Sequence, residues 1–121
     1  YTANPLGCAA ALASLELLEK EDCRFREMED WHREELAGLA DHPHLRRLRV
    51  CGTIAALEVE GAAGYLHELG PRLRQRFLER GFLLRPLGGV IYLVPPYCLE
   101  RGQLAEVYRC IREVVSAEVS S

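Results

Sequence analysis

The chain has 121 residues, of which 49% are hydrophobic and 27% are charged, and its formal net charge is −3. This length suits one compact domain, and the composition excludes a disordered or low-complexity chain. The acidic balance does not favour nucleic acid, and no apolar run reaches the roughly 18 residues that predict a transmembrane helix. We therefore expect no nucleic-acid partner and no membrane.

The first predicted element is a helix that starts at Asn4 and Pro5. Asparagine can cap the free N–H groups of a first turn, and proline fits the first helical position. Residues 6–18 carry small and apolar side chains on nearly every side, so this helix is expected to be buried on several faces. The pattern then becomes amphipathic and predicts helix to about residue 40, with a possible break near Asp22.

The rest of the chain predicts a small sheet with helices. Residues 41–44 form a loop, residues 48–60 a strand, and a helix ends at Arg80 before Gly81, with Gly70–Pro71 as its start or a kink. Short strands at 82–85 and 90–94 flank a turn, and a last helix covers residues 100–118. This order, α-β-α-β-β-α, predicts the α/β class in the form of a small α+β domain, with a largely antiparallel sheet packed against helices.

Several candidate reactive groups favour an ordinary structural role. His42 and His44 could chelate a metal with Asp41, but this set is weak, and we expect a solvated loop and no metal. The basic run at 46–49 suggests phosphate binding, yet the acidic chain favours a solvated approach to a strand. Lys20, the only lysine, lies in a charged stretch and is expected to be an exposed helix lysine.

The cysteines predict the compartment. They are odd in number and include no C-x-x-C pair, which indicates unpaired side chains that act mostly as small apolar residues in a reducing compartment, the cytoplasm. They are Cys8, Cys23, Cys51, Cys98 and Cys110. The chain lacks an initiator methionine, and we expect a processed chain or a piece of a longer protein.

Arg85 is a stronger candidate. It ends a predicted strand and is followed by Pro86 and a glycine turn. The planar guanidinium suits bidentate binding of a carboxylate, and the end of a strand would hold it firmly. From the residues alone, a structural salt bridge is the favoured role, and a carboxylate site is the alternative.

Three segments resemble one family. Residues 1–11 (Y-T-A-N-P-L-G-C-A-A-A) resemble the [YF]-x-[GA]-N-P-L-[AG]-C-A-A-A stretch of class III pyridoxal-phosphate aminotransferases. Residues 84–98 (L-R-P-L-G-G-V-I-Y-L-V-P-P-Y-C) closely resemble R-P-[LF]-G-x-x-I-Y-x-x-P-P-Y, a signature of the members of that class that act in biotin biosynthesis. Residues 49–54 are a weaker match. The likeness covers the whole chain and corresponds to the C-terminal part of such enzymes.

The resemblance implies a fold-type I aminotransferase that works as a homodimer with pyridoxal 5'-phosphate as its cofactor. Residues 1–40 would be the interdomain linking helix and its continuation, and residues 41–121 the C-terminal small domain. The implied reaction moves an amino group from S-adenosylmethionine to 8-amino-7-oxononanoate and gives 7,8-diaminononanoate. Arg85 matches the arginine that binds the substrate carboxylate, and Tyr92 matches a tyrosine near the site.

The resemblance also implies what is missing. The Schiff-base lysine of the family lies well upstream of the matched segments, so the chain would contain no catalytic and no cofactor-binding residue and would be inactive alone. Two other functions stay open: another class III aminotransferase, or a non-catalytic α+β module that binds small molecules.

Overall fold

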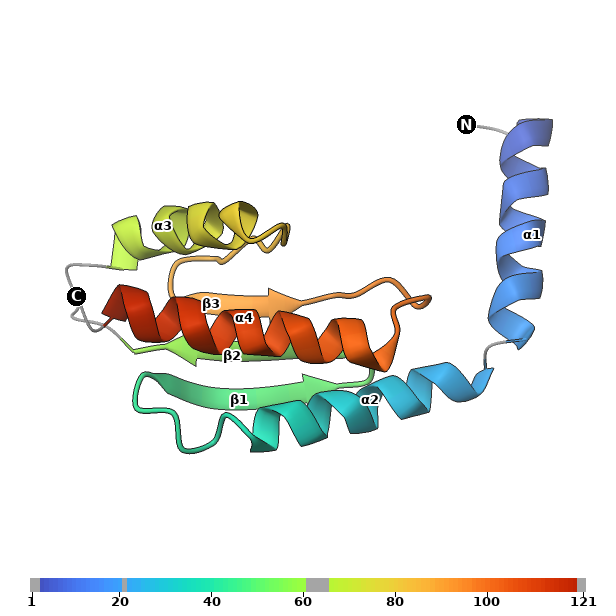
Figure 1. Ribbon diagram of the computed structural model, residues 1–121. Coiled ribbons are helices and arrows are strands. Elements are labelled where there is room, and N and C mark those ends of the chain that lie inside the picture. Colours follow the sequence, from blue (N-terminus) through green and yellow to red (C-terminus); the bar gives the residue numbers. More distant parts are fainter. Residues whose placement is uncertain (1–2, 21, 61–65, 120–121) are drawn as a thin grey trace.

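The computed structural model describes residues 3–20, 22–60 and 66–119. Over these ranges the helices are α1 (Pro5–Lys20), α2 (Asp22–Ala37), α3 (Leu66–Glu79) and α4 (Arg101–Val119), and the strands are β1 (Leu45–Cys51), β2 (Ile54–Val59) and β3 (Val90–Leu93) (Figure 1). The predicted break near Asp22 is confirmed, because α1 ends and α2 begins there. In the described ranges no helix combines the length and apolar character that crossing a membrane requires.

The strands form one antiparallel sheet in the order β1-β2-β3, which confirms the predicted sheet. Its two faces differ: Leu57 and its partner Ile91 are buried, whereas Ala56 and its partner Tyr92 are partly exposed on the other face. Figure 1 shows α4 in front of the sheet and α2 beside β1. The core therefore lies between one face of the sheet and the helices; its largest apolar side chains are Leu39, Leu45, Leu57, Leu69, Leu73, Phe77, Ile91, Leu104, Tyr108 and Ile111.

Two strand predictions were wrong. The predicted strand at 48–60 is the hairpin of β1 and β2, which reverses at Gly52 with φ at 57°. Apolar and β-branched residues continue on both sides of Gly52, and this glycine is the only turn residue between the two strands, so the sequence pattern predicts one strand. Residues 82–85 pair with no strand in the structure. They lead instead from the end of α3, where Gly81 (φ 83°) caps the helix as predicted, to the turn before β3.

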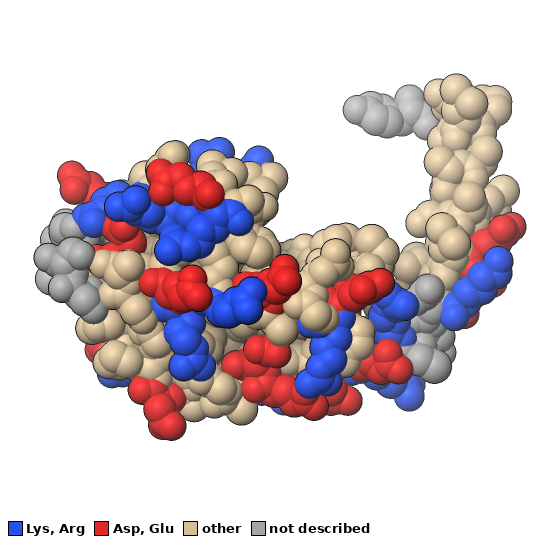
Figure 2. All heavy atoms as spheres, in the orientation of Figure 1, with Lys and Arg blue, Asp and Glu red and all other residues tan. Residues whose placement is uncertain are grey.

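The helix α1 projects away from the rest of the molecule (Figure 1). It buries none of its residues, and Leu6 and Leu12 are 80% and 62% exposed. Figure 2 shows charged side chains only near its C-terminal end. The burial that its sequence predicts is therefore not supplied by the residues that the structure describes.

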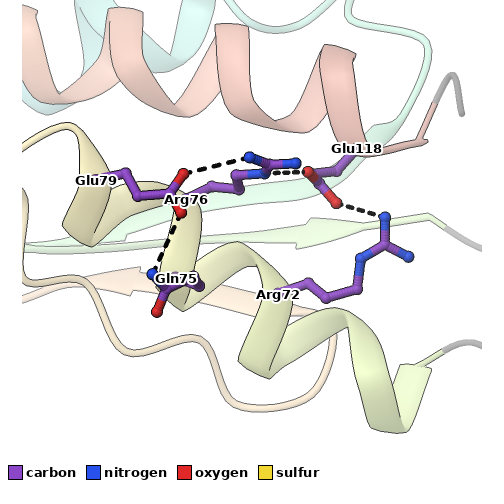
Figure 3. A network of polar contacts seen from close by, with 5 residues as sticks. All are labelled: Arg72, Gln75, Arg76, Glu79 and Glu118. Carbon is purple, nitrogen blue, oxygen red and sulfur yellow. Dashed lines mark hydrogen bonds and ion pairs between the residues drawn. The ribbon is translucent and has the colours of Figure 1, made fainter.

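An ion-pair cluster joins α3 to α4 (Figure 3). Glu118, in the last turn of α4, is 5% exposed. Its Oε2 accepts a hydrogen bond of 2.6 Å from Arg72 Nη2, and its Oε1 accepts one of 2.7 Å from Arg76 Nε. The hydrogen bond from Arg76 is the main reason that the pKa of Glu118 lies below its ordinary value. The two arginines offset the unfavourable position of a carboxylate at a helix C-terminus.

Replacing Glu118 with glutamine is expected to lower the free energy of unfolding by about 1–2 kcal/mol, because the amide cannot accept two charge-assisted hydrogen bonds. Urea unfolding measures this change. Glu113→Gln is the matched control: the Glu113 carboxylate and Arg80 are both exposed and 4.0 Å apart, so we expect a change below about 0.5 kcal/mol. Equal effects of the two variants would contradict a special role for Glu118.

A buried histidine ties α2 to both the hairpin and α4. His32 Nε2 lies 3.1 Å from the carbonyl oxygen of Thr53, and Nδ1 lies 2.7 Å from the hydroxyl of Tyr108. Since a carbonyl only accepts, Nε2 carries the proton and Nδ1 accepts from Tyr108. Burial lowers the pKa of His32 and raises that of Tyr108, so the ring stays neutral and the phenol keeps its proton.

Candidate functional site

The histidines of the 41–44 loop do not form a ligand set. The prediction of a solvated loop is wrong for His42, which is 8% exposed. Its Nε2 lies 2.9 Å from Ser116 Oγ on α4, and its Nδ1 accepts the backbone N–H of His44. Burial is the main reason that the pKa of His42 lies below its ordinary value, and the neighbouring His44 and Arg112 lower it further. Within the described ranges, no three His, Cys, Asp or Glu side chains gather around a possible metal position.

The basic residues of β1 are exposed as predicted, and acidic residues of the hairpin pair with them. Arg49 Nη1 lies 3.1 Å and Arg47 Nη1 3.5 Å from Glu58, and Arg46 Nη2 lies 3.0 Å from Glu60. These pairs leave little free positive charge for a phosphate.

The structure describes the side chains of Lys20 and of four cysteines, while the expectation for the Cys23 side chain lies outside the part that the structure describes. Lys20 lies exposed in the last turn of α1, as predicted. Cys8, Cys51, Cys98 and Cys110 are free, but of these only Cys110 is buried, so the role as small apolar residues holds for that one alone.

Arg85 and Tyr92 line the same pocket, which has a volume of about 270 Å³. Residues 83–85 form one side, and the end of β3 with the following prolines forms another. The helix α4 contributes a third. Arg85 is the only charged residue among those that line it; the others are Leu83, Leu84, Tyr92, Leu93, Val94, Pro95, Pro96, Leu99, Leu104 and Val107.

Two anchors hold the segment that carries Arg85. On one side, the N–H of Phe82 donates to the carbonyl of Phe77 at 2.9 Å, which fixes the segment to the end of α3. On the other side, Leu87 and Val90 exchange two backbone hydrogen bonds of 2.9 Å each. Pro86 lies between Arg85 and this turn, and its ring fixes φ there. The backbone of Arg85 is thus held at both ends.

The Arg85 side chain is exposed, and no acidic side chain of the described residues forms an ion pair with it. The structure therefore does not place it in the structural salt bridge that the residues alone favoured. A largely aliphatic pocket with one free guanidinium suits a ligand that has an aliphatic chain ending in a carboxylate.

The sequence did not reveal the aliphatic wall of this pocket. Leu104 and Val107 both lie on α4 and line the pocket, yet Leu104 is fully buried and Val107 is partly exposed. Pro95 and Pro96 follow β3 and have no backbone N–H to donate to the sheet. They also line the pocket, between β3 and Leu99.

Comparison with known proteins gives a consistent result. The family model for aminotransferase class III matches residues 1–115. Adenosylmethionine-8-amino-7-oxononanoate aminotransferase of Synechococcus elongatus is 50% identical over 116 residues, which are 95% of this chain and 27% of that protein. An omega-aminotransferase of Caulobacter vibrioides is 32% identical over 117 residues, 95% of this chain and 27% of that protein.

Solved structures share the fold. The crystal structure of adenosylmethionine-8-amino-7-oxononanoate aminotransferase from Methanocaldococcus jannaschii matches with a TM-score of 0.83 and 30% identity, over 97% of this chain and 28% of that chain. The chain thus spans little more than a quarter of the length of the relatives that it matches.

Proposed function

Because the chain belongs to the class III aminotransferase family, we propose that it forms the C-terminal part of an enzyme of biotin biosynthesis. The complete enzyme would transfer an amino group from S-adenosylmethionine to 8-amino-7-oxononanoate and produce 7,8-diaminononanoate. The relatives that carry the name of this enzyme support the proposal, among them one that is 50% identical.

The observation that carries the proposal is the pocket with one guanidinium at Arg85. The keto acid has an aliphatic chain with a carboxylate at one end, and a pocket of apolar side chains beside a free arginine complements both features. Arg85 would bind the carboxylate with two hydrogen bonds. The length of the substrate chain would then fix the distance between Arg85 and the reacting carbonyl. The half-buried ring of Tyr92 would border the same chain.

Class III aminotransferases generally depend on pyridoxal phosphate, which acts as the electron sink of amino transfer. The residues present do not fit this group: the one lysine, Lys20, lies exposed on α1, outside the pocket. We place the lysine that holds the cofactor in a part of the enzyme outside these 121 residues, and we expect the isolated chain to be inactive.

The exposed helix α1 supports the proposed domain organisation. Within residues 1–40 it would link the cofactor-binding domain to the small domain of residues 41–121, and its apolar surface would be covered by the former. We also propose that the complete enzyme is a homodimer and that it lies in the cytoplasm. The free cysteines are in keeping with the cytoplasm, which is a reducing compartment.

The test is to assay the complete protein that contains these residues, loaded with pyridoxal phosphate, for 7,8-diaminononanoate. We expect product with S-adenosylmethionine as donor and none from the isolated 121-residue chain. Turnover of simple amines with no turnover of 8-amino-7-oxononanoate would favour an omega-aminotransferase, which the 32% identical relative supports as the second candidate. Lysine in place of S-adenosylmethionine tests the donor.

A further inference from the structure

A glycine of α3 lies unusually close to the turn that follows Arg85. Gly70 is buried, and a Cβ atom at this position would lie 3.1 Å from the carbonyl oxygen of Gly88 and 3.5 Å from its nitrogen. Few real Cβ atoms approach another atom as closely as 3.1 Å. Both neighbouring atoms belong to the backbone, so neither can rotate away as the end of a side chain would.

The turn cannot move freely away from α3, because the sheet holds its other side. The N–H of Val59 on β2 donates to the carbonyl of Gly89 at 2.7 Å, and Val90 continues directly into β3. Gly88 has φ at 57°, a conformation that favours glycine. The turn is thus fixed between the sheet and the bare backbone of Gly70.

The position of this turn determines the position of Arg85. Only Pro86 and Leu87 separate Arg85 from Gly88, and the proline ring fixes one of the few backbone rotations that could absorb a displacement. A shift of the turn by a few tenths of an ångström would therefore move the guanidinium relative to the pocket.

We propose that Gly70 is a positioning residue, which sets the distance between Arg85 and the carboxylate of the substrate through its contact with Gly88. This inference rests on the proposed function of the pocket. It also explains a glycine within a helix, where alanine is ordinarily more stable. Pro71 offers a competing explanation, because the ring of a proline crowds the Cβ of the residue before it.

The experiment compares two substrates in the complete, cofactor-loaded enzyme: 8-amino-7-oxononanoate and its carboxamide, which has no charge for Arg85 to bind. The readout is the ratio of their kcat/KM values. For Gly70→Ala we expect this ratio to fall about threefold to tenfold, since a misplacement of 1 Å can cost about a hundredfold. We expect a larger fall for Gly70→Val, and kcat for the carboxamide within about twofold of its original value.

Gly102→Ala is the matched control, because it is also a helical glycine but a Cβ there meets nothing within 4 Å. Its ratio should not change. Measuring Gly70→Ala in a Pro71→Ala background separates the two explanations: the fall persists if the contact with Gly88 is its cause, and disappears if crowding by Pro71 is.

Three results would overturn the inference: an unchanged ratio in both Gly70 variants, an equal fall in Gly102→Ala, or loss of the effect in the Pro71→Ala background. Arg85→Ala distinguishes these from a failure of the proposed function. If that variant keeps the preference for the carboxylate, Arg85 does not bind it, and both the carboxylate site at Arg85 and the role of Gly70 are wrong. If it loses the preference while the Gly70 variants keep it, only the role of Gly70 is wrong.

Discussion

In the complete enzyme, Arg85→Ala is expected to lower kcat/KM for 8-amino-7-oxononanoate by about a hundredfold. The Arg85 side chain is exposed, so water weakens its hydrogen bonds, and we expect the pair together to contribute about 2.7 kcal/mol, which corresponds to this factor. The guanidinium is free of other ion pairs among the described residues, so its removal breaks no structural contact of that kind. Steady-state kinetics of the purified variant measures the change.

Two further variants make the test specific. Arg85→Lys should recover only part of the activity, because lysine keeps the charge but not the planar pair of donors. Arg74→Ala is the control, since Arg74 is exposed on α3 and does not line the pocket. An Arg85→Ala enzyme that retained its kcat/KM, or lost the same factor with the carboxamide, would contradict the carboxylate site.

His32→Phe is expected to lower the free energy of unfolding by about 3 kcal/mol. Phenylalanine fills a similar volume but leaves the buried Tyr108 hydroxyl and the partly buried Thr53 carbonyl without their partner. Each unsatisfied buried group costs about 1–3 kcal/mol. Urea unfolding followed by the fluorescence of Trp31, the only tryptophan and partly buried against the core, measures the change.

Tyr108→Phe supplies the comparison. It removes one of the two hydrogen bonds, and His32→Phe/Tyr108→Phe should be less destabilised than the sum of the single variants, because the hydroxyl left unsatisfied by the first change is gone. Strict additivity would show that the two side chains do not interact.

The pH dependence of the free energy of unfolding gives an independent check on the lowered pKa of His32. Its pKa is lower in the folded state, so the unfolded chain binds a proton that the folded chain does not. The stability is therefore complete above the ordinary pKa near 6.5 and decreases as the pH falls below it. The stability of the His32→Phe variant should therefore decrease less on acidification than that of the original protein. Some decrease should remain, because the pKa of His42 is also lowered in the folded state.

Much of this fold could be predicted from local signals. Asn4 and Pro5 mark the start of α1, and Gly81 the end of α3. The predicted strand at 90–94 corresponds to β3. Two other features of the fold could not be predicted. The turn at Gly52 has no second turn residue, and the burial of His42 depends on Ser116, 74 positions away.

The site was predicted unevenly for a similar reason. Arg85 and Tyr92 were selected by a motif, and the structure places both on one pocket. The motif says nothing about Leu104 and Val107, because these lie on a helix that follows it, and their shared apolar character does not show which of them borders a pocket. The contact of Gly70 with Gly88 is equally invisible, since it joins two backbones.

The different burial of Leu104 and Val107 on α4 affects how such a protein can acquire a new substrate. Leu104 is 1% exposed and belongs to the core as well as to the pocket wall, whereas Val107, one turn later, is only partly buried. A change of side-chain size at Leu104 would alter ligand length and destabilise the domain together. The same change at Val107 alters the pocket with less disturbance of the core. Substitutions at Val107 can therefore adapt the pocket to longer or shorter acceptors at a smaller loss of stability than substitutions at Leu104.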